Sequence, residues 1–204
     1  MKTRVLLGAA VFVAATAVIA AQVASQDKDK TGQPGEEMMQ AWMKYAGPGK
    51  FHAHLQPLVG RWTQEVKMWM APDAPPQIET GTSEYKWILG GRFLLQTVKG
   101  DSTEQGPAFE GLGIIGYDNF KKKYTSMWAD TMTTAIMTAL GTCDDSGKVF
   151  TFIGRHDDVF SGKPDQTVKT ITRIINNDSH VDEMYMTGPD GKEFKTLEVT
   201  YTRK

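Results

Sequence analysis

Short runs in which apolar and polar residues alternate fill the chain from Arg61 to its end. In the first run Trp62, Val66 and Met68 fall on one side, and mostly polar or charged residues lie between them. A period of two is typical of a strand with one buried face. About ten such runs, rich in Thr, Val, Ile and aromatic residues, are predicted as strands: 61–70, 79–89, 93–99, 109–117, 124–130, 135–142, 149–157, 167–176, 180–187 and 194–203.

The segments between these runs are short and rich in Gly, Pro, Asp and Asn, as at Asp118-Asn119. Tight reversals use these residues, and short connections join antiparallel neighbours. An open sheet of about ten strands would expose two long edges, which closure removes. The predicted fold is therefore all-β, a closed antiparallel β-barrel of about ten strands. Gly111, Gly113 and Gly116 interrupt one strand, which is typical of a place where a barrel bends.

The start of the chain has the layout of a secretory signal peptide. Lys2 and Arg4 precede an uncharged apolar run that ends in small residues, so residues 1–20 are predicted to be cleaved. Residues 21–35 are polar and are predicted as a flexible lead. We therefore expect a periplasmic or secreted protein, with no stable membrane insertion after the signal is removed.

A short helical segment is predicted over residues 36–60, ahead of a barrel domain over residues 61–204. Met38, Met39 and Trp42 follow helical spacing, and Gly47-Pro48-Gly49 ends this first helix. A second short helix is predicted over residues 51–58.

Charge and cysteine content narrow the classes of function. Removal of Lys2 and Arg4 with the signal leaves 21 basic against 24 acidic residues, a formal net charge of −3. Nucleic-acid binding is not expected, because it requires a basic surface. Cys143 is the single cysteine and precedes two aspartates. Nearby acids raise the pKa of a thiol, so a packing role is favoured over a reactive one.

Known catalytic and cofactor motifs lack the context that they require. The chain has no Gly-x-Ser-x-Gly sequence, and the glycines of residues 111–116 match a dinucleotide-binding pattern only inside a predicted strand. His52 and His54 are two metal-ligand candidates, but no Cys or acidic cluster nearby completes a set of four. No cofactor and no metal site are therefore predicted.

The head of the first strand, Leu58-Val59-Gly60-Arg61-Trp62, resembles the opening motif of lipocalins. That resemblance implies that Trp62 fills the base of the barrel and that a basic residue of the last strand, here Arg203, covers it. A longer set of motifs is similar to a family of exported bacterial proteins, domain of unknown function 1579. The motifs are Trp69-Met70-Ala71-Pro72, Trp87-Ile88-Leu89-Gly90-Gly91-Arg92-Phe93-Leu94, Phe109-Glu110-Gly111, Gly116-Tyr117-Asp118-Asn119, Glu183-Met184-Tyr185 and Tyr201-Thr202-Arg203-Lys204. This resemblance implies a lipocalin-like barrel and assigns no activity.

The leading functional hypothesis is that the barrel binds a small, largely apolar molecule, since a barrel of this size leaves room inside. Trp128 and Asp130 share one face of a strand, and Asp130 is expected to accept a hydrogen bond from a ligand at the cavity mouth. The candidate ligand-binding residues are Trp87, Trp128, Asp130, Met137 and Tyr185.

Three alternatives stay open at this point, and whether the protein is an enzyme is undecided. The first is an enzyme in which His156 or His180 works with a nearby carboxylate. The second is a haem-binding barrel with His180 as the axial ligand. The third is a non-catalytic interaction module that uses an exposed apolar patch of the barrel or the helix around residues 38–45.

Overall fold

The computed structural model describes residues 34–101, 108–158, 162–188 and 190–204, and it divides into two units, residues 1–47 and 48–204. The described part of the first unit is helix α2 (Pro34–Ala46), which agrees with the helix predicted around Trp42. Met38, Met39, Trp42 and Met43 are exposed on it. The predicted signal peptide and nearly all of the predicted lead lie outside the described residues. None of the described helices is long and apolar enough to span a membrane.

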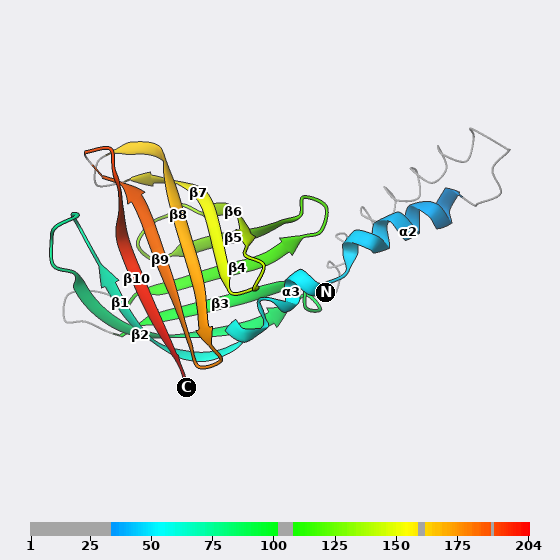
Figure 1. Cartoon of the computed structure of the whole chain (residues 1–204), viewed down its shortest axis with the longest axis horizontal. Coiled ribbons are helices and arrows are strands. Elements are labelled where there is room, and N and C mark those ends of the chain that lie inside the picture. Colours follow the sequence, from blue (N-terminus) through cyan, green and yellow to red (C-terminus); the bar gives the residue numbers. More distant parts are fainter. Residues whose placement is uncertain (1–33, 102–107, 159–161, 189) are drawn as a thin grey trace, which may run out of the picture. The chain divides into compact units, whose positions relative to one another are not determined.

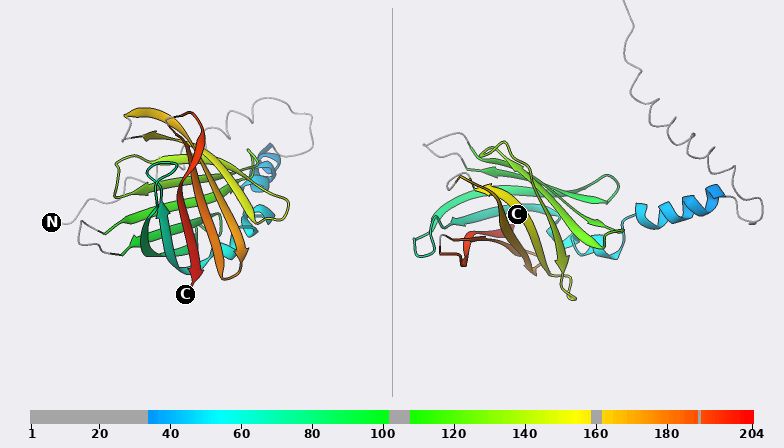
Figure 2. Two further views of the ribbon diagram at one scale, coloured as in Figure 1. Left: turned by 60° about the vertical axis from the view of Figure 1, so that its left-hand side comes forward. Right: turned by 90° about the horizontal axis from the view of Figure 1, so that it is seen from above.

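The second unit is a closed up-and-down barrel in which each strand pairs antiparallel with its sequence neighbours and β1 pairs with β10 (Figure 1). Two further views show the strands wrapping into one continuous wall (Figure 2). The described residues form β1 (Gly60–Met68), β2 (Gln77–Ile88), β3 (Phe93–Gly100), β4 (Glu110–Asp118), β5 (Lys123–Asp130), β6 (Met137–Cys143), β7 (Val149–Asp158), β8 (Lys163–Asn176), β9 (Ser179–Thr187) and β10 (Glu193–Arg203). The predicted all-β closed barrel is confirmed.

Most predicted strand bounds lie within two residues of the observed ones, and two local predictions differ more. Strand β8 begins at Lys163 rather than 167, because the chain continues to pair with β7 beyond an irregularity between His156 and Asp158. The second predicted helix is divided into α3 (Lys50–Ala53) and a 3-10 turn, η1 (Gln56–Leu58). Pro57 lies inside η1, where its fixed φ suits a short tight turn.

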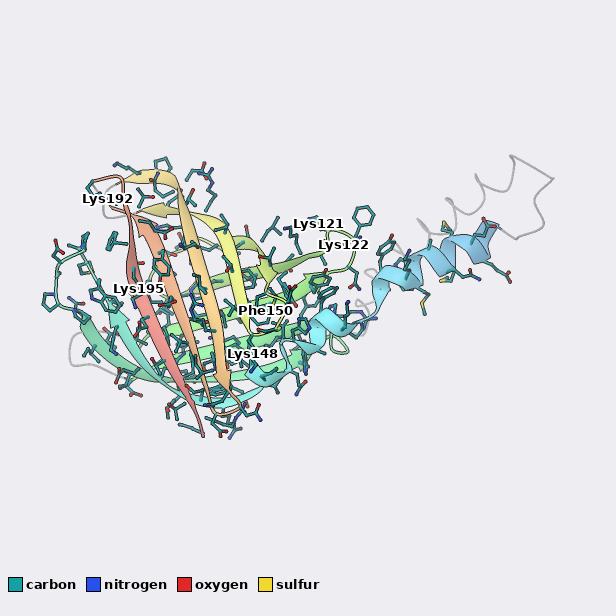
Figure 3. The ribbon with its side chains drawn as sticks, viewed as in Figure 1. Lys121, Lys122, Lys148, Phe150, Lys192 and Lys195 are labelled. Atoms are coloured by element: carbon teal, nitrogen blue, oxygen red, sulfur yellow. The ribbon has the colours of Figure 1, made fainter. Side chains whose placement is uncertain are left out.

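One end of the barrel is filled by side chains. Leu55 and Leu58, from the segment with α3 and η1, pack with Trp62, Leu94 and Phe150 in the buried core. Figure 3 shows Phe150 at this end. The lysines that Figure 3 labels include Lys121 and Lys122, which are exposed at the turn between β4 and β5. This filled end is called the closed end below, and the opposite end is called the open end.

Arg203 and Trp62 lie at the closed end as the lipocalin resemblance implies. The Arg203 guanidinium lies 4.1 Å from the centre of the Trp62 ring. It also donates hydrogen bonds to the carbonyls of Pro57 and Val59, both at 2.9 Å, and to that of Asn177 at 2.6 Å. One guanidinium therefore joins η1, the last strand and the turn between β8 and β9.

The glycines of β4 make room for a side chain of the next strand. A Cβ on Gly111 would lie 2.5 Å from the Trp128 ring, and one on Gly113 would lie 3.2 Å from it. Trp128 pairs with Gly113 across the β4–β5 ladder, so its ring lies over two positions that have no side chain, Gly111 and Gly113. Gly111 and Gly113 thus have a packing role beside the predicted bend, because a side chain at either position would meet the Trp128 ring.

Candidate functional site

The open end of the barrel contains a cavity of about 350 Å³. Most of its wall is apolar, and every strand contributes to it. Representative wall residues are Val66, Val98, Met137, Phe152 and Met184. Cavities that hold small molecules have volumes of about 300–1,000 Å³, with apolar walls and a few converging polar groups. The cavity has the size and the wall of such a site.

Polar side chains converge where the cavity meets the core. Asp182 accepts a hydrogen bond from the Thr172 hydroxyl at 2.5 Å and another from the Tyr201 hydroxyl at 3.0 Å. The Gln96 amide donates to the Tyr201 oxygen at 3.3 Å. All four residues line the cavity. We call this group, together with Gln64, the polar floor.

Burial controls the ionisation of the polar floor. It raises the pKa of the Asp182 carboxyl, although the hydrogen bonds from Thr172 and Tyr201 oppose that rise. Burial, and after it the negative charge of Asp182, raises the pKa of Tyr201 well above its ordinary value. Tyr201 therefore keeps its proton and remains a donor to Asp182.

Gln64 completes the polar floor and makes no side-chain hydrogen bond with the residues that the structure describes. It is 6% exposed, lines the cavity and lies opposite Tyr201 in the β1–β10 register. A side-chain amide can donate two hydrogen bonds and accept two. The Gln64 amide is thus available to a molecule in the cavity.

Trp128 and Asp130 lie toward the open end of the cavity. The Trp128 indole nitrogen donates to Asp130 at 2.7 Å, and the second oxygen of Asp130 accepts from the backbone of Met132 at 2.9 Å. The Trp128 ring is stacked with Phe109, with 6.4 Å between the ring centres. Asp130 therefore holds the indole in place as well as lining the cavity.

His180 lies on the core side of the polar floor, at the closed end. It is 1% exposed, and its ring stacks on Tyr201 at 4.0 Å and meets Trp62 edge-on at 4.4 Å. Neither ring nitrogen has a hydrogen-bond partner among the described residues. Burial, and after it the charge of Arg203, lowers the pKa of His180 to about 3. The imidazole is therefore neutral at physiological pH.

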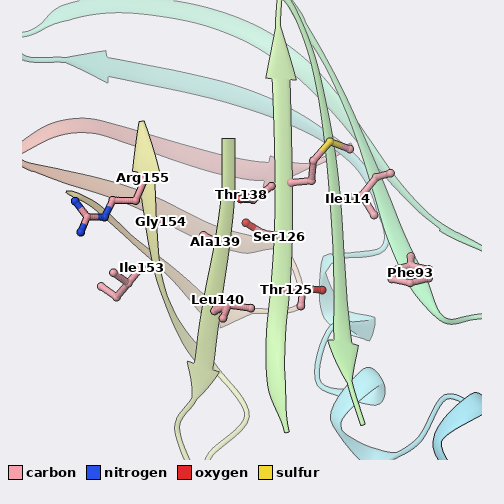
Figure 4. A pocket seen from close by; sticks show the side chains of 11 residues that line it. Phe93, Ile114, Thr125, Ser126, Thr138, Ala139, Leu140, Ile153, Gly154 and Arg155 are labelled. Atoms are coloured by element: carbon pink, nitrogen blue, oxygen red, sulfur yellow. The ribbon is translucent and has the colours of Figure 1, made fainter. Parts of the chain in front are cut away.

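A second hollow, of about 580 Å³, opens on the outer face of strands β3 to β7 (Figure 4). Ile114, Leu140 and Ile153 line it, and Leu140 and Ile153 are exposed. Arg155 is the one charged residue among the described residues that line it, and it already pairs with Asp165 at 3.5 Å. This hollow gives the outer face of the barrel an exposed apolar surface. The converging polar groups that a ligand site requires lie in the inner cavity instead.

A family model described as a protein of unknown function, DUF1579, matches residues 47–203. The chain belongs to the DUF1579 family. This confirms the family resemblance found in the sequence, and the matched region is the barrel with the segment that fills its closed end.

One solved structure similar to this DUF1579 protein is the crystal structure of Rv2717c from M. tuberculosis, with a TM-score of 0.56 and 14% identity. The match covers 78% of this chain and 99% of that chain, and at this identity it concerns the fold alone. A redesigned β-barrel matches with 13% identity over 74% of this chain and 95% of that chain. Its TM-score of 0.38 is too low to support an argument. No curated protein matches the chain.

The five residues predicted to bind a ligand in this DUF1579 protein fall in three places. Trp128, Asp130 and Met137 line the inner cavity. Trp87 packs against the core, where its indole nitrogen donates to Gln56 of η1 at 2.7 Å, so it does not line the cavity. Tyr185 also does not line it, because β9 turns Asp182 and Met184 inward. The Tyr185 ring lies beneath the ammonium of Lys169, 4.5 Å away.

The histidine-based hypotheses gain no support from the geometry. Neither His156 nor His180 forms a hydrogen bond or ion pair with a carboxylate among the described residues. The Tyr201 ring covers one face of His180, and the imidazole does not line the cavity, so it presents no ring nitrogen to a haem there. His52 and His54 are used at the closed end, where His52 accepts from Gly49 and His54 contacts Tyr124 at 3.1 Å.

The polar floor was missed in the sequence, although signals for it were present. Asp182 alternates in phase with Met184, and Tyr201 alternates in phase with Val199 and Leu197, so both residues were placed on apolar faces. Gln64 interrupts the apolar side of the first strand between Trp62 and Val66. A polar residue in phase with the buried face of a barrel strand is the signal that would have found this group.

Proposed function

We propose that this protein binds a small, largely apolar molecule in the cavity at the open end of the barrel. The observation that carries the proposal is an apolar cavity of about 350 Å³ with converging polar groups at its floor. Met137 and Met184 add flexible, polarisable walls that suit an adaptable apolar site. The Gln64 amide, which makes no side-chain hydrogen bond with the described residues, supplies a donor and an acceptor for a ligand.

The first test is native mass spectrometry of the protein purified from its own host. The proposal expects a mass excess that denaturation releases as a small organic molecule. A variant with a filled cavity, Thr170→Trp, should lose that excess, because Thr170 lines the cavity.

Thr167→Trp is the matched control, since Thr167 is exposed on the same strand and does not line the cavity. It should keep the bound molecule. Equal retention in both folded variants would place the molecule elsewhere and would refute the proposed site.

We also propose that the protein is exported and works in the periplasm or outside the cell. The support is the basic start, apolar run and small residues of positions 1–20. Amino-terminal sequencing of protein recovered from the host should find a new terminus close to residue 21. Recovery of the protein from the cytoplasmic fraction with Met1 retained would contradict export.

A further inference from the structure

We propose that the ligand of the inner cavity is an organic cation, a protonated amine attached to an apolar body. The inference rests on the proposed function of the cavity and names the chemical class that it takes. The ammonium would lie at the polar floor beside Asp182, and the apolar body would extend along the wall toward Trp128.

The first argument is the charge of the lining. Asp182, Asp130 and Glu79 line the cavity, and no lysine, arginine or histidine is among the described residues that line it. Among the described lining residues, an anion would meet acidic side chains and no basic one. A cation would be attracted by all three carboxylates in surroundings that screen charge less than water does.

The second argument is that Asp182 has no cationic partner. Its carboxyl forms no ion pair with the described residues, and only two neutral hydroxyls donate to it. Its neighbour Glu183 points outward and pairs with Arg173 at 3.2 Å and with Lys195 at 3.5 Å. Within the described part of the chain, the outward carboxylate of this strand therefore has cationic partners and the inward one has none. A carboxyl group turned into a protein interior is ordinarily paired with a cation or kept neutral by a proton, and the hydroxyls of Thr172 and Tyr201 already donate to both oxygens of Asp182. An ammonium bound beside Asp182 would supply the counter-ion and favour its ionised form.

The third argument is the set of groups around Asp182. An ammonium has three donors and no acceptor, and it requires oxygen atoms around it. The two oxygens of Asp182 and the carbonyl oxygen of the Gln64 amide are acceptors on the polar floor. Gln64 is 6% exposed and its side chain makes no hydrogen bond with the described residues. Farther out, the Trp128 ring lines the wall and offers an aromatic surface to an apolar body.

The test compares three probes with the same apolar chain: n-octylamine, n-octanol and n-octanoate. Each is titrated into the purified protein by calorimetry in phosphate buffer at pH 7, where the amine is protonated and the acid is ionised. We expect octylamine to bind at least about tenfold more tightly than octanol, a difference of about 1.4 kcal/mol, and octanoate to bind most weakly.

The outcomes separate this inference from the proposed function. If octanol or octanoate binds as tightly as octylamine, the inference of a cationic ligand is wrong, and the proposal that the cavity binds an apolar molecule stands. Failure of all three probes to bind folded protein would overturn both proposals. The comparison uses the unaltered protein, so it does not depend on whether a variant folds.

Asp182→Asn and Glu183→Gln form the matched pair of variants. Both remove one negative charge from adjacent positions of β9, but Asp182 lines the cavity and Glu183 does not. We expect Asp182→Asn to lose the roughly tenfold preference for octylamine over octanol and to keep its affinity for octanol. Glu183→Gln should keep the full preference. Loss of the preference in both variants would assign it to the overall charge of the protein and would overturn the role of Asp182.

Discussion

Replacement of His180 by phenylalanine should remove most of the decrease in the free energy of unfolding that this residue causes at acidic pH. The ring is 1% exposed and lies between Tyr201 and Trp62, with neither nitrogen hydrogen-bonded to the described residues. A phenyl ring keeps this aromatic packing and has no polar atom to desolvate. At pH 7.5 we therefore expect His180→Phe to be as stable as the natural protein or to gain about 1–2 kcal/mol.

The magnitude follows from the two pKa values of the imidazole. Its pKa is 6.5 in the unfolded chain and about 3 in the folded protein. Between these values the unfolded state binds more protons, so stability is fully present above pH 6.5 and is lost as the pH falls toward 3. At pH 4.5 the loss spans about two pH units at 1.36 kcal/mol each, or about 3 kcal/mol. His180→Phe lacks this loss.

The assay is urea unfolding at pH 7.5, 6.5, 5.5 and 4.5 for both proteins. The raised pKa of Asp182 acts in the opposite direction, since it favours the folded state as the carboxyl takes up a proton. That contribution is common to both proteins and largely cancels in their difference. Tyr85→Phe is the control, because Tyr85 packs edge-on against His180 and its pKa lies far above this range. Parallel stability curves for His180→Phe and the natural protein would refute the reasoning.

Three further variants or reactions test other parts of the molecule. Arg203→Leu should lower the free energy of unfolding by about 2–5 kcal/mol in urea, because three carbonyls lose a charged donor. Gly111→Ala should lower the free energy of unfolding by about 1–3 kcal/mol and change Trp128 fluorescence, because the new Cβ would lie 2.5 Å from the indole. Gly49→Ala is the control and should keep the natural spectrum, because a Cβ at that position meets nothing within 4 Å. Cys143 should react with iodoacetamide at pH 8 about 100-fold more slowly than an unperturbed thiol, because burial raises its pKa to about 11.

The strand order and the closed end were predictable because each rests on a local signal. Alternation and turn residues located the strands within a few residues, and short connections fixed the antiparallel order. The position of Arg203 over Trp62 came from the motif at the head of β1. The segment 51–58 was less predictable, since its division into α3 and η1 depends on how it packs into the barrel end.

The lining of the cavity was predicted only in part, for a physical reason. Alternation separates two faces of a strand but does not say which face is inside when both carry apolar residues. On β9 the outward face holds Tyr185, which Lys169 and Lys195 flank, while the inward face holds His180 and Asp182. Tyr185 is among the predicted ligand-binding residues but does not line the cavity, and Asp182 was missed because carboxylates rarely face a protein interior.

The barrel separates stability from binding along its axis, and this separation can be tested. Leu94 is fully buried in the core of the closed end, while Asp182 lines the cavity. Leu94→Ala should therefore lower the free energy of unfolding by about 2–5 kcal/mol, measured in urea, and should keep the affinity of the folded protein for octylamine. Asp182→Asn should do the reverse, losing octylamine affinity at a smaller cost in stability. Tyr201 joins the two regions, since it stacks on His180 and donates to Asp182. A loss of affinity in Leu94→Ala as large as that in Asp182→Asn would mean that core and cavity are one coupled unit.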